Sequence, residues 1–487
     1  MNDDLENAGP PGLLAGDLRS RPCRLIFARR DFQAASEIGQ KIKDEALRYI
    51  AERIPGNKGD IIVFNSLGHA RSDLLDVALP GGLAPGHILY QQDQPLEWQS
   101  AGGERILVSG HRVPGFGYTC LSAGPAREVP GKPETSLRVS RQVMENRFFR
   151  MEFDEGGLIA SLYHKSIDRE YVKAGSRANC FQAFEDLPPD HDAWNIDPFY
   201  RGKYWTITEL NTLAILEEGP LRGTMMMERP FGRSIITQHI RIYRDMDRID
   251  FVTKIAWWEN NTMLKVLFPV DLATDQAACE IQFGYLYRPT HTNTPWEKAK
   301  FEVCAQRWVD VSEKDWGIAL INNGKYGHDI TRGVIGLTCL RSPSYPDSDA
   351  DRGQHEFAYA LFPHQGTVGD APVTERAAEF NEPLIPAVKG NGAGSWPPER
   401  SWITLDNPAI VLAAVKLSEY GEGVIVRVYE SRGKRVAGSI AFWKPPVRAW
   451  SCTLLEMQQE EIPVRDRSLT LHFHPFEIKT LMVFFDR

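Results

Sequence analysis

The sequence predicts a mainly β protein, with several β-sandwich domains in series behind one amphipathic helix. After residue 56, apolar residues occur in short runs bounded by Gly, Pro, Asn and Asp, which is typical of strands joined by turns. Only residues 32–54 carry a clear apolar stripe at helical spacing. No repeat of about 20–50 residues is present, which argues against a solenoid or a propeller. With 487 residues, the chain is too long for a single domain.

Bulk composition narrows the classes of function. The net charge of −8 argues against a nucleic-acid surface, which needs concentrated Lys and Arg. No apolar run approaches about eighteen residues, so no membrane span is expected. The acidic start has no long apolar region and does not resemble a secretory signal. The seven cysteines are scattered without a C-x-x-C pair, which predicts reduced thiols and a cytoplasmic protein.

The first ordered element is expected to be a helix over residues 32–55, after a disordered N-terminus over residues 1–31. Pro55-Gly56 ends the apolar pattern. No second helix of similar quality follows, so this helix resembles the last member of a bundle. Its apolar stripe consists of Ala35, Ile38, Ile42, Ala46, Tyr49 and Ile50.

Three β domains are expected after the helix. A small sandwich over 56–130 begins with the buried run DIIVFN and ends at a Pro-rich linker. A large β-supersandwich follows over 137–385, and a C-terminal sandwich over 398–487 lies beyond a Gly- and Pro-rich stretch. Expected strands include Arg147–Phe153, Leu158–His164, Ile235–Tyr243, Ile249–Trp258, Lys265–Val270, Glu280–Tyr287, Phe301–Val309, Trp316–Asn322, Gly333–Leu340 and Glu356–Phe362.

Residues 181–200 form the segment with the clearest functional chemistry. Three prolines favour an ordered loop rather than a helix or strand. Carboxylates beside aromatic faces suit a sugar, since they offer acceptors for hydroxyl groups and a flat surface for the C–H face of a ring. The same composition also occurs in loops that only cap a sheet. The segment contains Glu185, Asp186, Asp190, Asp192 and Asp197 among Phe184, Trp194, Phe199 and Tyr200.

Hydrolysis of a glycosidic bond needs two carboxylates about 5–5.5 Å apart in retaining enzymes and farther apart in inverting ones. Asp192 and Asp197 would form such a pair only if the loop doubled back. Lining a sugar pocket is therefore the favoured role for these residues.

A second acidic cluster has a simpler explanation than a metal site. Asp347, Asp349 and Asp351 alternate like the start of an EF-hand calcium loop, but Arg352 and Ala358 occupy positions that need Gly and Glu, so a solvated acidic loop is favoured. The sequence contains no nucleotide-binding, serine-hydrolase or zincin motif.

The histidines offer no clear metal or acid site. His472 and His474 point to one face of a strand, yet no third ligand is close in sequence, which favours a surface pair. His191 lies between Asp190 and Asp192, and a hydrogen-bonded loop histidine is the commoner explanation than a tuned acid.

From about Phe32 to Leu481 the chain resembles the C-terminal half of family 38 of the glycoside hydrolases, the α-mannosidases, in the bacterial and cytosolic branch. The resemblance rests on long segments, which makes it specific. These segments are DIIVFNSLGHARSDLL (60–75), ENRFFRMEFDEGGLIASLYHK (145–165), ANCFQAFEDLPPDHDAWNIDPFY (178–200), residues 280–313 and residues 322–364.

The resemblance implies a large central domain similar to the galactose mutarotase supersandwich. It also implies a retaining hydrolase of α-mannosidic bonds that uses a divalent ion, usually zinc. In the family, the nucleophile and most metal ligands come from an N-terminal α/β domain, with further ligands from a helix bundle. Those motifs are not found in this sequence, so we expect no catalytic residue, no metal ligand and no activity from this chain alone.

A substrate-binding role is implied for Arg341, Asp192, Trp194 and Asp197. Arg341 resembles an arginine that reaches the active site in relatives, and the other three match a strongly patterned loop. The chain departs from the family at Asn195, where relatives have Asp, and at Gln306, where they have His.

Three roles stay open, with mannose-containing glycans as the expected ligands. The chain is the β part of an α-mannosidase, a stand-alone carbohydrate-binding or scaffold protein, or one half of a two-chain enzyme. The stripe on 32–54 is further expected to drive self-association or to bind a separate α/β half.

Overall fold

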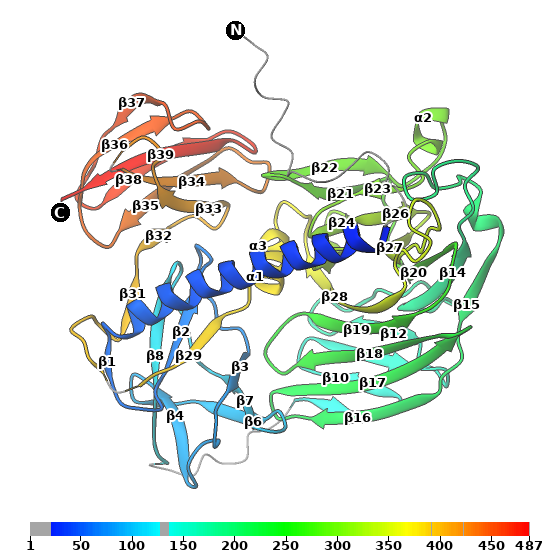
Figure 1. Ribbon diagram of the computed structural model, residues 1–487, viewed down its shortest axis with the longest axis horizontal. Helices are drawn as coiled ribbons and strands as arrows, with labels where there is room; N and C mark the ends of the chain where they lie inside the picture. Colours follow the sequence, from blue (N-terminus) through cyan, green and yellow to red (C-terminus); the bar gives the residue numbers. More distant parts are fainter. Residues whose placement is uncertain (1–20, 127–135, 391, 422, 487) are drawn as a thin grey trace. The chain divides into compact units, whose positions relative to one another are not determined.

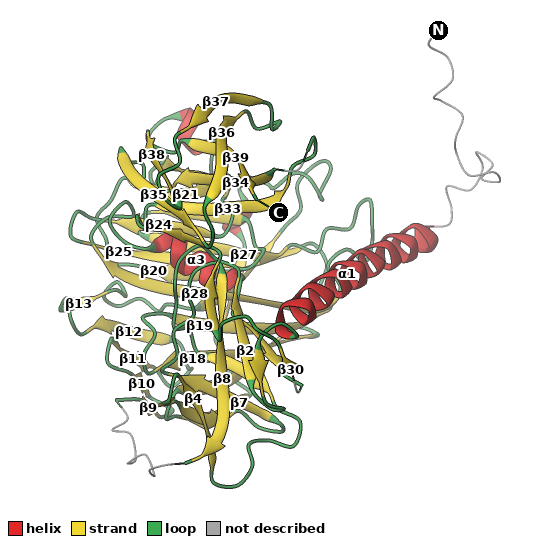
Figure 2. Cartoon of the chain, turned by 90° about the vertical axis from the view of Figure 1, so that its left-hand side faces the viewer, coloured by secondary structure: helices red, strands yellow, loops and turns green. Residues whose placement is uncertain are grey.

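The computed structural model describes residues 21–126, 136–390, 392–421 and 423–486. These residues fall into two compact units. Most of the regular structure of the chain is strand (Figure 2). The first unit takes the described residues within 21–58 and 389–397, and the second takes those within 59–388 and 398–486. The mainly β class expected from the sequence is confirmed.

The first unit consists of the long helix α1 (Arg21–Ala51) and a two-stranded sheet of β1 (Pro55–Gly56) and β30 (Gly392–Ala393). The prediction that residues 21–31 are disordered was wrong, because the helix begins at Arg21. Pro22 lies in its first turn, where a missing backbone N–H costs nothing. Residues 1–20 lie outside the described residues.

A small β domain opens the second unit. One sheet has the order β29-β2-β8-β4-β5, with β31 also paired to β8, and the other has the order β3-β7-β6. The stretch 382–399, expected only as a boundary, supplies β29, so the sheet is completed by residues that follow the central domain. The strands are β2 (Ile61–Asn65), β3 (Leu75–Ala78), β4 (His87–Gln91), β5 (Gln94–Pro95), β6 (Glu97–Ser100), β7 (Arg105–Ser109), β8 (Gly117–Pro125), β29 (Ile385–Val388) and β31 (Glu399–Ser401).

The central domain contains three antiparallel sheets (Figure 1). Their strand orders are β13-β12-β11-β10-β9, β15-β14-β20-β27-β26-β23 and β16-β17-β18-β19-β28-β25-β24-β21-β22. The strands are β9 (Arg138–Val139), β10 (Val143–Glu145), β11 (Phe149–Phe153), β12 (Ile159–His164), β13 (Arg169–Glu170), β14 (Cys180–Glu185), β15 (Tyr204–Ile207), β16 (Thr212–Glu218), β17 (Arg222–Phe231), β18 (Ser234–Tyr243), β19 (Ile249–Trp257), β20 (Thr262–Pro269), β21 (Gln276–Ile281), β22 (Gly284–Pro289), β23 (Val303–Cys304), β24 (Trp308–Ser312), β25 (Trp316–Asn322), β26 (Gly327–Thr331), β27 (Val334–Leu340) and β28 (Gly353–Gln365).

The predictions of two continuous strands in the central domain were wrong. Residues 280–287 are divided between β21 and β22 by a turn at residues 282–283, and residues 301–309 are divided between β23 and β24. Continuous apolar and aromatic runs concealed both breaks. Two short helices, α2 (Pro295–Lys298) and α3 (Val373–Asn381), were not expected, and α3 lies against β24 and β25.

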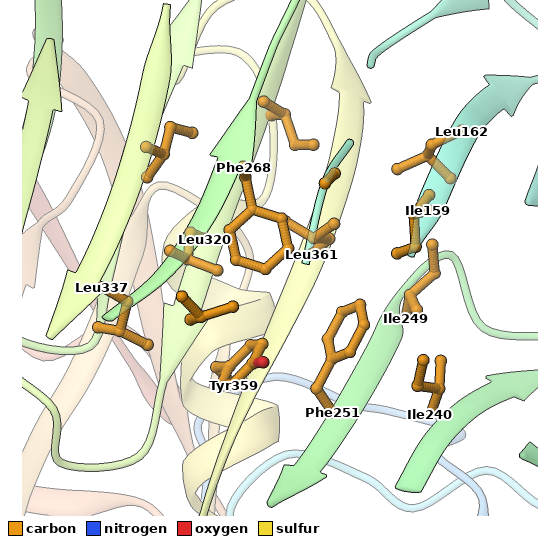
Figure 3. Close-up of a cluster of buried hydrophobic side chains, with 14 of the residues drawn as sticks. Ile159, Leu162, Ile240, Ile249, Phe251, Phe268, Leu320, Leu337, Tyr359 and Leu361 are labelled. Carbon is orange, nitrogen blue, oxygen red and sulfur yellow. The ribbon is translucent and has the colours of Figure 1, made fainter. Parts of the chain in front are cut away.

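Apolar side chains from the three central sheets meet in one core (Figure 3). Phe251 of β19 stacks on Tyr359 of β28 with ring centroids 5.1 Å apart, and Phe268 of β20 meets Tyr359 edge-on. Ile159 and Leu162 of β12 lie in the same cluster. Alternating side chains of each strand face this core, and such burial supplies the main stabilisation of a sandwich.

The C-terminal domain is a sandwich of two antiparallel sheets. Their orders are β32-β35-β38 and β33-β34-β39-β36-β37. Ile440, Val426 and Leu481 are among the buried residues between them. The strands are β32 (Ile403–Leu405), β33 (Ile410–Leu417), β34 (Val424–Glu430), β35 (Val436–Phe442), β36 (Pro446–Cys452), β37 (Gln458–Ile462), β38 (Ser468–Phe473) and β39 (Ile478–Phe485).

Candidate functional site

The candidate site consists of the loop of residues 186–199 between β14 and β15, together with residues 341–345, which follow β27. We call these two segments the wall. The prediction that residues 181–200 are all loop was wrong at its start, because Phe181–Glu185 pair with both β15 and β20 as part of β14. The prolines begin only at residue 188, where the strand has already ended. A 3-10 turn at Tyr200–Gly202 returns the chain to β15.

Arg341 joins the two segments of the wall. Its Nε and Nη2 donate to Asp186 Oδ2, each at 2.7 Å, and Nη2 also donates to the backbone oxygen of Asn195 at 2.6 Å. Asp186 is buried, and burial raises the pKa of its carboxyl although Arg341 opposes the shift. Among the described residues, Arg341 Nη1 has no hydrogen-bond partner. One guanidinium thus fixes the loop from inside and retains a donor group for a ligand.

Asp192 makes a second connection between the two segments of the wall. Its carboxylate accepts hydrogen bonds from the Ser344 backbone at 2.7 Å, the Ser344 hydroxyl at 3.0 Å and the Tyr345 backbone at 3.1 Å. The Ser344 backbone hydrogen bond lowers the pKa of Asp192. Asp192 is therefore an ionised acceptor whose oxygens hold the segment after β27 in place.

Two aromatic side chains of the loop are left outside. Trp194 is 66% exposed and Phe199 is 76% exposed. The Trp194 ring contacts His191 edge-on, with centroids 6.1 Å apart. Asp197 Oδ1 accepts from the Phe199 backbone at 2.8 Å, which shapes the turn below that ring. The loop, which is held by hydrogen bonds, therefore exposes the flat rings of Trp194 and Phe199 close in sequence to the carboxylates of Asp192 and Asp197.

A buried cluster of charges holds the end of the loop. Lys265 of β20 is fully buried, and its Nζ lies 2.5 Å from both Glu302 Oε1 and Asp329 Oδ1. Tyr200, the first residue after the loop, donates to Glu302 at 2.6 Å. Arg201 contacts Asp329 at 2.5 Å. We call these five residues the Lys265 cluster. The sequence did not reveal it, because its members are scattered over β20, β26, the 3-10 turn and the segment before β23.

All four predicted binding residues lie in the wall, but they have different contacts. Arg341 and Asp192 hold its two segments together, Asp197 supports the turn, and Trp194 is exposed. Asp186 was not among the predicted binding residues. Its place directly after a buried strand was the only signal for its role as the buried partner of Arg341.

The other candidate clusters form internal contacts. Asp351 Oδ2 accepts from the backbone of Arg341 at 3.1 Å, and Asp349 binds Arg352 at 2.7 Å. His474 accepts from Arg435 at 2.5 Å. Within the described ranges, no group of three His, Cys, Asp or Glu side chains is placed to hold a metal ion.

Cys120, Cys180, Cys279, Cys304, Cys339 and Cys452 are free thiols. None of the helices in the described part of the chain has both the length and the apolar character needed to span a membrane.

Two family descriptions match the sequence. "Glycosyl hydrolases family 38 C-terminal domain" matches residues 144–349, which include the whole loop of the wall and Arg341. "Glycosyl hydrolases family 38 C-terminal beta sandwich domain" matches residues 409–481. The two matches cover most of the central and C-terminal domains.

Curated relatives show the same similarity over more of the chain. Alpha-mannosidase 2C1 of Mus musculus is 33% identical over 445 residues, covering 88% of this chain and 40% of that protein. Alpha-mannosidase G of Dictyostelium discoideum is 34% identical over 388 residues, covering 76% of this chain and 36% of that protein. The chain thus spans about two fifths of the length of these relatives.

A solved structure shares the fold. An alpha-mannosidase from Enterococcus faecalis V583 superposes with a TM-score of 0.76 at 16% identity, covering 95% of this chain and 60% of that one. Identity this low supports the fold and nothing finer. The agreement extends through the central and C-terminal domains.

Proposed function

Because the chain belongs to glycoside hydrolase family 38 as a C-terminal part of its α-mannosidases, we propose that the wall binds an α-mannoside. In this proposal Trp194 packs against the C–H face of the sugar ring. Arg341 Nη1 donates a hydrogen bond to a ring hydroxyl. The carboxylates of Asp192 and Asp197 hold the loop in place and also accept hydrogen bonds from sugar hydroxyls. Mannose-containing glycans are the ligands that we infer.

The observation that carries the proposal is the double attachment of Arg341 to Asp186 and to the Asn195 backbone. A capping loop needs no buried charged pair to cover a sheet, and burying one costs desolvation free energy. A binding loop benefits from it, because a rigid loop loses less entropy when a ligand binds. The exposed Trp194 lies directly beside the anchored Asn195.

Replacing Trp194 by alanine is expected to weaken binding of methyl α-mannoside by about tenfold, the loss expected for one stacking contact of roughly 1.4 kcal/mol. Isothermal titration calorimetry or NMR titration of the whole chain measures this. Tyr420→Ala is the matched control, since Tyr420 is an exposed aromatic residue of the C-terminal domain. Arg341→Lys is expected to weaken binding similarly, because an ammonium group cannot make both directed contacts. Equal affinity for Trp194→Ala and Tyr420→Ala would refute the proposal.

Hydrolysis is proposed for a whole enzyme that contains this wall, and not for the wall by itself. Asp186 is engaged with Arg341, and Asp192 with Ser344 and Tyr345, so neither is placed as a free nucleophile. The remaining groups would come from an α/β part, on the same chain or on a second one, and we derive no step through a metal. A stand-alone carbohydrate-binding role is the alternative. The free thiols support a cytoplasmic setting for either role.

The helix α1 supports the proposal of a further partner. Phe32, Ile38, Ile42 and Tyr49 are each more than half exposed, so the first unit does not bury its own apolar stripe. We expect the isolated chain to self-associate through this stripe, and Ile38→Glu with Ile42→Glu to leave a monomer in light scattering. A monodisperse monomer before substitution would contradict this expectation.

A further inference from the structure

A partly open cavity lies in the second unit where its three β domains meet, away from the residues of the wall. Its volume is about 320 Å³. Leu67–His69 line it from the small domain, Phe283 and Glu375 from the central domain, and Leu412 from the C-terminal domain. The domains are in close contact beside it, since a Cβ atom on Gly68 would lie 2.7 Å from Leu412 Cβ.

Part of the cavity lining is apolar and partly aromatic. Ile410, Leu405 and Leu412 of the C-terminal domain line it, and Phe283 meets Tyr429 edge-on with ring centroids 5.4 Å apart. A pocket with such a lining and a few polar groups has the composition that small-molecule sites share, and its volume lies at the lower end of their range of about 300–1,000 Å³. One ring-sized molecule is therefore the size that fits.

Other lining residues carry polar side chains. Gln282 and Gln306 are among them, and no side-chain hydrogen bond of either residue is found among the described residues. Glu375 Oε1 accepts from Arg432 at 2.5 Å, but its buried Oε2 has no partner. A buried acceptor without a donor costs about 1–3 kcal/mol, so a ligand that donates to Glu375 would be stabilised. Two amides supply both donors and acceptors beside it.

The cations at the cavity are already neutralised. Arg307 binds Glu280 at 2.6 Å, and His69 Nε2 lies 2.9 Å from Glu379 Oε1. Arg432 is paired with Glu375. An anion would therefore find no unpaired cation among the described residues that line the cavity. A neutral molecule with several hydroxyl groups matches both the polar and the apolar parts of the lining.

We propose that this junction cavity is a second binding site that takes a single neutral, polyhydroxylated ring such as a free hexose. Ring hydroxyls donate to Glu375 Oε2 and exchange hydrogen bonds with Gln282 and Gln306. The C–H face of the ring lies against the apolar part of the lining. Because all three β domains line the cavity, an occupied site ties them together.

The test uses the whole chain carrying Trp194→Ala, in which binding at the wall is weakened by about tenfold. D-glucose and methyl α-mannoside are titrated in saturation-transfer difference NMR, and binding to this variant is expected. Ala413 lines the cavity and is exposed, so Ala413→Trp places an indole at its opening. We expect this added substitution to weaken binding by at least about tenfold. Ala437→Trp, at an exposed position of the same domain that does not line the cavity, is the control.

A second variant tests the chemical class. Gln282→Leu with Gln306→Leu keeps the volume and removes both amides, so it is expected to lose the sugar as Ala413→Trp does. The proposal is overturned if the Trp194→Ala chain shows no saturation transfer, if Ala413→Trp and Ala437→Trp bind alike, or if the leucine variant binds as before. If Trp194→Ala alone abolished binding, the wall would be the sugar site and the proposal of a junction site would fail. If Ala413→Trp abolished binding in the otherwise unchanged chain, the junction cavity would be the sugar site and the proposal for the wall would fail.

Discussion

Replacing Lys265 by methionine is expected to lower the free energy of unfolding of the central domain by about 3–5 kcal/mol. Burial alone would lower the pKa of Lys265, but Asp329 and Glu302 raise it above its usual range, so the ammonium form is stable in the interior. Removing it leaves Glu302 and Asp329 buried with one remaining cation, Arg201. Urea unfolding followed by tryptophan fluorescence measures the loss.

The sign of the pH dependence distinguishes this cause from lost packing. Burial already raises the pKa of Glu302, and Lys265 opposes that shift. Without Lys265 the pKa of Glu302 rises further, and a raised carboxyl pKa gives a loss of stability that grows as the pH increases. Lys265→Met should therefore be more destabilising at pH 8 than at pH 5, and adding Glu302→Gln should restore part of the loss. Equal destabilisation at both pH values would contradict the electrostatic explanation.

Acidification from pH 7 to pH 5 is expected to cost about 4 kcal/mol of stability through His111 and His328. Burial lowers the pKa of each to about 4 from an ordinary value of 6.5. Both ring nitrogens of His111 lack a partner, and His328 Nδ1 meets only the Tyr326 backbone, at 3.0 Å. The unfolded chain takes up the protons first, so stability falls between about pH 6.5 and pH 4, by about 2 kcal/mol for each histidine at pH 5.

The matched variants are His111→Phe, His328→Asn and, at an exposed position, His472→Asn. Each of the first two should remove about half of the acid effect measured by urea unfolding, and His472→Asn should remove none. His364 acts in the opposite direction, because Asp310 raises its pKa against the effect of burial. An unchanged acid effect in the double variant of His111 and His328 would show that other groups cause it.

Most strands of the fold could be predicted because alternating or continuous apolar runs are local signals. Residues 316–322 were predicted at their observed limits. Breaks inside apolar runs could not be seen, since the turn at Gln282 and Phe283 contains neither Gly nor Pro. The helix start was missed because Arg21–Asp31 lacks a clear stripe.

The candidate site could be predicted only as a segment and not as a set of contacts. Its carboxylates and aromatics are close in sequence, which made the loop visible. Asp186 and Arg341 are 155 residues apart and are brought together by the pairing of β14 with β20 and of β20 with β27. The members of the Lys265 cluster are dispersed in the same way, so only tertiary structure reveals that they meet.

The insertion of the central domain between β8 and β29 affects how the protein is made. On the ribosome, β2 emerges early but receives its partner β29 only after more than 250 further residues have been synthesised at roughly 5–20 residues per second. During that interval β2 is an unprotected edge strand of five residues that are all buried in the finished protein. Synthesis therefore contains a delay of some tens of seconds in which the small domain is open to misassociation.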